Sequence, residues 1–147
     1  MRLLLQRVTR AEVRVDHAVV GSIGPGLLVF VGIGHGDTPQ IVGAMVDKTL
    51  GLRIFRDEGG RTNRSLVDVA GELLAVSQFT LYADTRKGRR PSFLDAAPPD
   101  LGDGLYRAYA DAVAARGITV ARGVFGAEMA VDLVNDGPFT IWLDSAG

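Results

Sequence analysis

The chain has 147 residues and a formal net charge of −1, contains no cysteine, and is 47% hydrophobic and 22% charged. This composition excludes a disordered chain, and the lack of cysteine excludes disulfide scaffolds, thiolate metal sites and a cysteine nucleophile. The length predicts a single domain over residues 1–147. The longest apolar run, Leu27–Val31, is far below the roughly 20 residues that span a bilayer, and Met1–Leu5 is too short for a signal peptide. We therefore expect a cytoplasmic protein that does not enter membranes.

The N-terminal part of the chain has the patterns of strands. Leu3–Val8 is strand-like, and Ala11–Val15 alternates with period two before a tight turn at residues 16–17. Ala18–Val20 then completes a predicted β-hairpin. Leu27–Val31 is apolar on both faces, which predicts a buried central strand.

A helix is predicted next, with Thr38 as its N-cap, Pro39 at its first position and Gly51 able to terminate it. Leu73–Val76 begins another strand-like region, which runs on to Leu81.

The last part of the chain alternates between loop, helix and strand. Thr85–Pro99 is loop-like, and a second helix is expected from Asp100 to Gly117. Two final strands, Met129–Leu133 and Phe139–Leu143, are expected on either side of a turn at residues 135–138. Strands dominate over two clear helices, so we expect an α/β fold, or an α+β fold, with a mixed, strand-rich sheet.

The glycine-rich segment Gly32–Gly36 follows a buried strand and invites a dinucleotide-binding interpretation. A Rossmann fingerprint needs a further glycine at position 37, where this chain has Asp37, and its strand would not belong to a hairpin. A histidine-based serine hydrolase is disfavoured as well, because Ser77 is not in a Gly-x-Ser-x-Gly elbow and His17 and His35 lie in turns. Neither a cofactor nor a metal site is expected.

Three further segments leave alternatives open. Four cations stand within five residues, at Arg86, Lys87, Arg89 and Arg90, either as a solvated run or as a phosphate clamp. Ser77–Thr80 places three hydrogen-bonding side chains at a strand end, which an exposed strand end also explains. Residues 137–138, a Gly-Pro pair, can be an ordinary turn.

Five segments favour one interpretation over these alternatives, and two of them are long motifs in a specific order and spacing: Leu5–Ala11, Arg53–Phe55, Val76–Asp84, Gly88–Phe93 and Leu133–Pro138. On these segments the chain resembles a bacterial D-aminoacyl-tRNA deacylase of the D-tyrosyl-tRNA(Tyr) deacylase type over nearly its whole length. One departure is Phe139, where the family usually has valine, which affects the expected size of the pocket near that motif.

The resemblance implies a hydrolase that cleaves the ester between a D-amino acid and the 3′ end of tRNA, and also clears glycine from tRNA for alanine. It implies catalytic roles for Ser77, Gln78, Phe79 and Thr80. We expect main-chain N–H groups of this segment to stabilise the developing negative charge and the ribose 2′-hydroxyl to assist, since no base is available to activate Thr80.

Chiral selection is expected from a second segment. By the same resemblance, Gly137–Pro138 is a cis peptide that enters the active site of the other subunit of a homodimer, with Arg7 holding it in place. There it would exclude L-amino acids, which protects the abundant L-aminoacyl-tRNA. The two subunits would pack as a barrel-like homodimer with the active site at their interface.

The 3′ acceptor end of aminoacyl-tRNA is thus the expected partner, with phosphate contacts from the basic segment 86–90. Two other classes remain. A non-catalytic RNA-binding module would explain the basic segment, although only Phe79 and Tyr82 suggest stacking aromatics. A nucleotide-dependent enzyme would use Gly32–Gly36.

Overall fold

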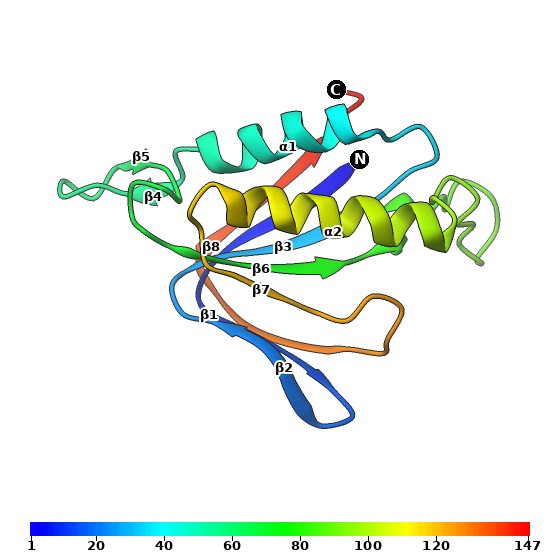
Figure 1. The fold of residues 1–147 in the computed structure, drawn as a ribbon, viewed down its shortest axis with the longest axis horizontal. Helices are drawn as coiled ribbons and strands as arrows, with labels where there is room; N and C mark the ends of the chain where they lie inside the picture. The colour runs from blue at the N-terminus through cyan, green and yellow to red at the C-terminus, as the bar shows by residue number, and fades with distance from the viewer.

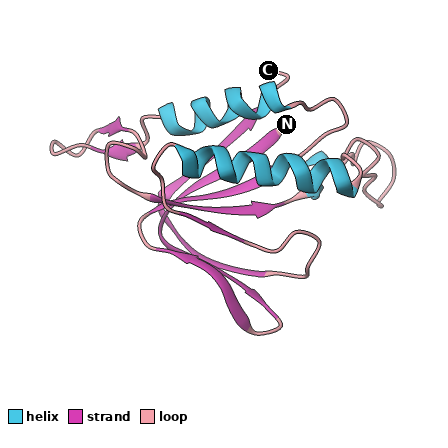
Figure 2. Ribbon diagram, viewed as in Figure 1, coloured by secondary structure: helices cyan, strands magenta, loops and turns pink.

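The computed structural model describes residues 1–147 and forms a layer of two helices over a twisted sheet (Figures 1 and 2). The helices are α1 (Pro39–Gly51) and α2 (Pro99–Ala115), which pack against each other on one face of the sheet. The sheet strands are β1 (Arg2–Val15), β2 (Ala18–Ile23), β3 (Gly26–Gly32), β6 (Glu72–Ser77), β7 (Val120–Arg122) and β8 (Ala130–Asp144). A separate two-stranded ribbon contains β4 (Phe55–Arg56) and β5 (Thr62–Arg64).

The sheet has the order β2-β1-β3-β6-β7. The first half of the long strand β1 pairs with β3 and its second half with β2, while β8 pairs with β1 along both halves. β3–β6 and β6–β7 are parallel pairs, whereas β1 is antiparallel to β2, β3 and β8. The sheet curls so far that β2 approaches β7, and a Cβ atom on Gly21 would lie 2.7 Å from the carbonyl oxygen of Arg122. The expected α/β class, with a mixed, strand-rich sheet and two main helices, is confirmed, and the sheet of one chain is itself nearly barrel-like.

Two apolar cores lie on the two faces of this sheet. The larger core packs Leu3, Leu5 and Val29 against the apolar stripes of both helices, including Val46 and Tyr109. The smaller core fills the inside of the curl, and its buried residues are Val8, Ala11, Val13, Ile23, Leu28, Leu74 and Val76. Side chains alternate between the faces along β3 and β6, so each of these two strands contributes to both cores.

Most of the local predictions are confirmed. Leu27–Val31 lies in the middle of the sheet, between β1 and β6, and Thr38 caps α1 by accepting a hydrogen bond from the Ile41 N–H at 3.3 Å. The hairpin at residues 16–17 is present, and both turn residues have positive φ. The two expected N-terminal strands are one continuous strand, β1. The short strands β4, β5 and β7 were not predicted, because two or three residues are too few to show a period.

The predicted turn at residues 135–138 is wrong. β8 continues through it along the same partner, because Val8 pairs with Asn135 and Gln6 pairs with Thr140. One residue of β1 therefore faces four residues of β8, which makes a large bulge within one strand instead of a turn between two strands. The chain keeps its direction, so the Gly-Pro pair lies on the edge strand of the sheet.

Neither α1 nor α2 combines the length and the apolar character that a membrane-spanning helix needs.

Candidate active site

The carboxyl end of β6 carries the segment Ser77–Thr80. The strand ends at Ser77, and a short 3₁₀ helix follows over Phe79–Tyr82, so the prediction that the strand runs on to Leu81 is wrong. The Gln78 N–H donates to the Val31 carbonyl oxygen at 2.8 Å, which ties this turn to the end of β3. The first N–H groups of the 3₁₀ helix have no acceptor within it. Phe79 and Thr80 are exposed there.

A cavity of about 430 Å³ lies beside this segment. Ser77, Gln78 and Phe79 line one side of it, and the remaining lining residues are Val31, Ile33, Phe93, Ala96, Ala97, Pro99, Gly102, Tyr106, Phe125 and Gly126. The rings of Phe79 and Phe93 meet edge to face with centroids 5.0 Å apart. Such a mainly apolar pocket with a few polar groups at one side is typical of a small-molecule subsite.

Neither a histidine nor a carboxylate lines this cavity. Its one titratable side chain is Tyr106, whose hydroxyl donates to the Ala75 carbonyl oxygen at 2.8 Å. Burial raises the pKa of Tyr106, so the phenol stays neutral and is not a base at neutral pH. The Thr80 hydroxyl lies next to the Gln78 side-chain amide, which donates to it. The site therefore offers hydrogen-bonding groups and an apolar surface but no general base.

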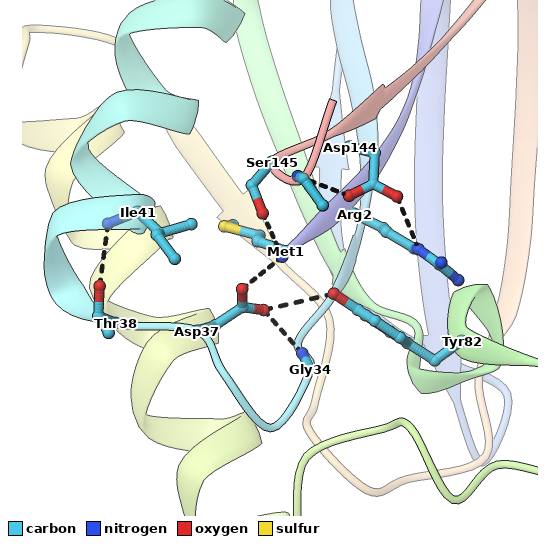
Figure 3. A network of polar contacts seen from close by, with 10 residues as sticks. Met1, Arg2, Gly34, Asp37, Thr38, Ile41, Tyr82, Asp144 and Ser145 are labelled. Atoms are coloured by element: carbon cyan, nitrogen blue, oxygen red, sulfur yellow. Dashed lines mark hydrogen bonds and ion pairs between the residues drawn. The ribbon is translucent and has the colours of Figure 1, made fainter.

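A network of polar contacts holds the 3₁₀ helix against Arg2 of β1 and the loop that contains Asp37 (Figure 3). Arg2 donates from Nη1 to the Leu81 carbonyl oxygen at 2.9 Å, and its guanidinium lies 4.4 Å from the centre of the Tyr82 ring. The Asp37 carboxylate accepts from the Gly34 N–H at 2.7 Å and from the Tyr82 hydroxyl at 3.5 Å. Burial, with Asp37 nearby, raises the pKa of Tyr82.

This network explains the glycine-rich loop that suggested a dinucleotide site. Asp37 stands where the fingerprint needs glycine, and its carboxylate also contacts the Met1 amino group (Figure 3). A Cβ atom on Gly34 would lie 2.7 Å from the Tyr82 hydroxyl oxygen. The glycine thus permits close packing against Tyr82. The loop is a structural support for the 3₁₀ helix, and the ordinary-turn interpretation accounts for it.

Arg7 holds the bulge of β8. Its side chain is only 4% exposed, and its Nη1 donates to the Ile54 carbonyl oxygen at 2.6 Å. Its Nε lies 3.2 Å from both the carbonyl oxygen and a carboxylate oxygen of Asp136, and the guanidinium lies 4.8 Å from the centre of the Phe139 ring. The Gly137–Pro138 peptide bond within the bulge is cis, and both residues are exposed.

Asn135 also shapes the bulge, and the sequence patterns did not single it out. Its Oδ1 accepts from the Phe139 N–H at 3.0 Å, and its Nδ2 donates to the Thr140 hydroxyl at 2.9 Å. An asparagine before Asp-Gly-Pro is typical of a turn in which the asparagine side chain hydrogen-bonds to nearby main-chain groups. This pattern could have indicated such hydrogen bonds at Asn135, but not which groups they join.

The two predicted halves of the site do not meet within one chain. Ser77 pairs with Val31 on β3, whereas Arg7 pairs with Leu27, four residues earlier. At about 3.3 Å per residue, this places them roughly 13 Å apart along the strands alone. β1 and β3 also lie between β8 and β6 in the sheet. The bulge and the Ser77–Thr80 segment are therefore separate features of the monomer.

The basic segment lies in a loop that is closed by two backbone hydrogen bonds between Asp84 and Ser92, at 2.8 and 2.9 Å. Arg86 folds back and donates to Asp84 from Nε at 2.8 Å and from Nη2 at 2.6 Å. These hydrogen bonds lower the pKa of Asp84. Lys87, Arg89 and Arg90 are exposed, and none of them lies within ion-pair distance of a carboxylate.

Comparisons with known proteins agree with the fold and the motifs. The family described as D-Tyr-tRNA(Tyr) deacylase matches residues 4–144. A D-aminoacyl-tRNA deacylase of Thermomicrobium roseum is 58% identical over 146 residues, which cover 99% of this chain and 95% of that protein. One of Deinococcus deserti is 55% identical over 144 residues, which cover 98% and 99%.

Solved structures show the same architecture. A c-Myc DNA unwinding element binding protein superposes with a TM-score of 0.92 at 39% identity, covering 98% of each chain. A probable eukaryotic D-amino acid tRNA deacylase has a TM-score of 0.86 at 21% identity over 97% of each chain, which supports the fold alone. These findings confirm both the resemblance and the assignment to hydrolases of the aminoacyl-tRNA ester bond. The chain belongs to the D-Tyr-tRNA(Tyr) deacylase family.

Proposed function

We propose that this protein hydrolyses D-aminoacyl-tRNA, releasing free tRNA and the D-amino acid, and also removes glycine from tRNA for alanine. The observation that carries this proposal is the apolar cavity bounded on one side by Ser77, Gln78 and Phe79. The terminal adenosine binds in this cavity, where Phe79 and Phe93 offer aromatic surfaces to the base. The ester then lies beside Gln78 and Thr80.

Catalysis relies on positioning and on stabilisation of charge. An aminoacyl ester is already activated, so water can attack it without a covalent enzyme intermediate. Main-chain N–H groups of Ser77–Thr80 stabilise the developing oxyanion, and the 2′-hydroxyl of the substrate assists the attack. The lack of a histidine or carboxylate around the cavity supports this mechanism, since no group there can activate the Thr80 hydroxyl.

The protein acts as a homodimer in which each bulge completes the partner's site. Two observations support this. The bulge and the Ser77–Thr80 segment are far apart within one chain, and an apolar row crosses the sheet on the face turned away from the helices, where Leu4 pairs with both Phe30 and Trp142. The Trp142 side chain is 47% exposed, so a second copy packed there buries it.

Gly137–Pro138 provides the chiral selection. The pair is exposed on a bulge that Arg7 and Asn135 hold in one shape, so it presents a rigid main chain to the partner's ester. A carbonyl placed beside the α-carbon excludes an L side chain while a D side chain projects elsewhere. Selection by exclusion spares the L-aminoacyl-tRNA that protein synthesis uses.

Incubation with D-tyrosyl-tRNA and with L-tyrosyl-tRNA, without added nucleotide, tests the proposal. Release of tyrosine from the D-ester alone is expected, and glycyl-tRNA(Ala) is expected to react as well. Tight tRNA binding without release identifies a non-catalytic RNA-binding module instead. A requirement for nucleotide identifies a nucleotide-dependent enzyme instead. Sedimentation of Trp142→Glu tests the dimer, because this variant should be monomeric and inactive.

A further inference from the structure

The unneutralised positive charge of this chain is concentrated in two places. Nine of the sixteen lysine and arginine side chains lie within ion-pair distance of a carboxylate, which leaves seven without one. Three of these seven belong to the loop at residues 84–95, which we call the basic loop. Another three belong to residues 53–64, which we call the ribbon because they include β4 and β5. The seventh is Lys48.

Three of the four arginines of the ribbon lie outside ion-pair distance of any carboxylate, and two of these three contact uncharged acceptors. Arg53 donates to the Asn63 carbonyl oxygen at 3.0 Å, and Arg64 donates to the main-chain carbonyl oxygen of Asp68 at 2.5 Å. The exposed side chain of Arg61 has no partner. Asp57 accepts from the Arg61 main-chain N–H at 2.9 Å, within the turn. With Glu58 at its tip, the ribbon has a net charge of +2 in a chain whose net charge is −1.

The ribbon is attached to the bulge of β8. Arg7 binds the Ile54 carbonyl oxygen and Asp136 together, and Arg56 lies 3.5 Å from the Asp136 carboxylate. The ribbon and the basic loop lie at opposite ends of the long axis of the molecule (Figure 1). In the proposed dimer the bulge reaches the partner's cavity and brings its own ribbon with it. The ribbon of one subunit and the basic loop of the other then flank one active site.

We propose that the ribbon binds the phosphate backbone of the tRNA whose 3′ end occupies the partner's cavity. This inference rests on the proposed function and on the dimer. Exposed guanidinium groups without carboxylate partners suit phosphate oxygens, and each phosphate contact releases condensed counterions. By itself, the basic loop contacts phosphates on only one side of the acceptor end. The ribbon supplies the second side, which no single subunit can provide.

Steady-state kinetics of Arg61→Gln tests this proposal, with Arg107→Gln as the matched loss of one exposed arginine on α2. For D-tyrosyl-tRNA, Arg61→Gln should raise KM, and the ratio of KM at 200 mM salt to KM at 50 mM salt should fall about threefold if one phosphate is no longer bound. Glu58→Gln should lower KM. Hydrolysis of the small substrate D-tyrosyl-adenosine should be unchanged in all three variants. If Arg61→Gln behaves like Arg107→Gln, the proposal is overturned.

Binding of uncharged tRNA in the same salts separates this proposal from the deacylase activity. If wild-type protein hydrolyses neither substrate, the proposed function fails, yet the ribbon is still tested by the affinity of Arg61→Gln for tRNA. Weaker binding with a shallower salt dependence supports the role of the ribbon. Binding equal to that of Arg107→Gln overturns it.

Mixed dimers test whether the ribbon acts across the interface. One subunit carries Arg61→Gln with an intact cavity, and the other carries Ala97→Trp, which fills its own cavity but leaves its ribbon intact. The one working cavity then faces the intact ribbon, so KM should equal that of the wild type. A KM as high as that of the Arg61→Gln homodimer would show that the ribbon serves its own subunit, against the proposal.

Discussion

Replacing Arg7 by alanine removes the group that ties the bulge of β8 to the ribbon. The buried guanidinium donates to the carbonyl oxygens of Ile54 and Asp136, and each hydrogen bond to a charged group contributes about 1.5–3 kcal/mol. The Asp136 side chain is 32% exposed and can be rehydrated, so the lower part of this range applies to it. We therefore expect the free energy of unfolding to fall by about 3–4 kcal/mol.

Thermal unfolding at fixed protein concentration measures this decrease. With an unfolding entropy of about 2.1 cal/mol/K per residue, a chain of this length loses about 3 °C of Tm per kcal/mol, so Arg7→Ala should melt roughly 10 °C below the wild type. The Tm of Arg7→Lys should lie between those of Arg7→Ala and the wild type, because one ammonium group cannot reach both carbonyl oxygens. Below its melting range, Arg7→Ala should also discriminate less between D- and L-tyrosyl-tRNA.

Arg10→Ala is the matched control on the same strand. Arg10 pairs with Asp132 at 3.2 Å, but both side chains are more than half exposed, so this pair contributes less than about 1 kcal/mol. Its Tm should stay within about 3 °C of the wild type. If Arg7→Ala melts as high as Arg10→Ala, the bulge is not held by Arg7 and the argument for its rigidity is wrong.

Three further predictions concern the basic loop and the segment Ser77–Thr80. Replacing both Arg89 and Arg90 by alanine should lower the slope of log KM against log salt concentration by about 0.7 for each single-stranded phosphate that is no longer bound. Arg86→Ala should lower this slope less, because Arg86 already pairs with Asp84. Equal slopes in all variants would contradict phosphate binding. Thr80→Ala should retain a deacylation rate within about tenfold of the wild type, because Thr80 is not the nucleophile, and removal of a nucleophile would cost orders of magnitude in rate. A substrate whose terminal ribose lacks the 2′-hydroxyl should react far more slowly. The reverse pattern would refute the RNA-assisted mechanism. The Asp84 pKa, measured by NMR, should lie below its ordinary value of about 3.9 and rise in Arg86→Ala. Because the folded pKa is depressed, the ion pair is present at neutral pH and breaks only as the pH falls through that depressed value; the same titration in both proteins would contradict it.

Local patterns predicted the elements whose signals lie within a few residues. Thr38 and Pro39 start α1 as expected, because a capping side chain and a fixed φ act on their own turn. Leu27–Val31 is a central strand because an apolar run of this length must be covered on both faces. The hairpin at residues 16–17 follows for the same local reason.

The patterns failed where distant segments decide the outcome. Asp-Gly-Pro at residues 136–138 signals a turn in isolation, yet β1 holds both sides of it in register and Arg7 binds it from across the strand, so a bulge forms. The predicted strand over Ser77–Leu81 ends at Ser77, because its parallel partner β3 ends at Gly32 and a 3₁₀ helix follows over Phe79–Tyr82. Neither the contacts that hold the bulge nor the end of β3 can be seen in the local sequence.

The sequence by itself determined the family, the order of the principal elements and the two motifs, because these depend on residue identity and on short-range periodicity. Only the tertiary structure decided how those motifs are placed. The cavity draws its walls from β3, β6 and α2 and from the loops at Phe93 and Phe125, which are brought together by parallel strand pairing over long stretches of chain. Likewise, the separation of Arg7 from Ser77 depends on strand register. Register arises from packing of the whole chain, which no local window of residues specifies.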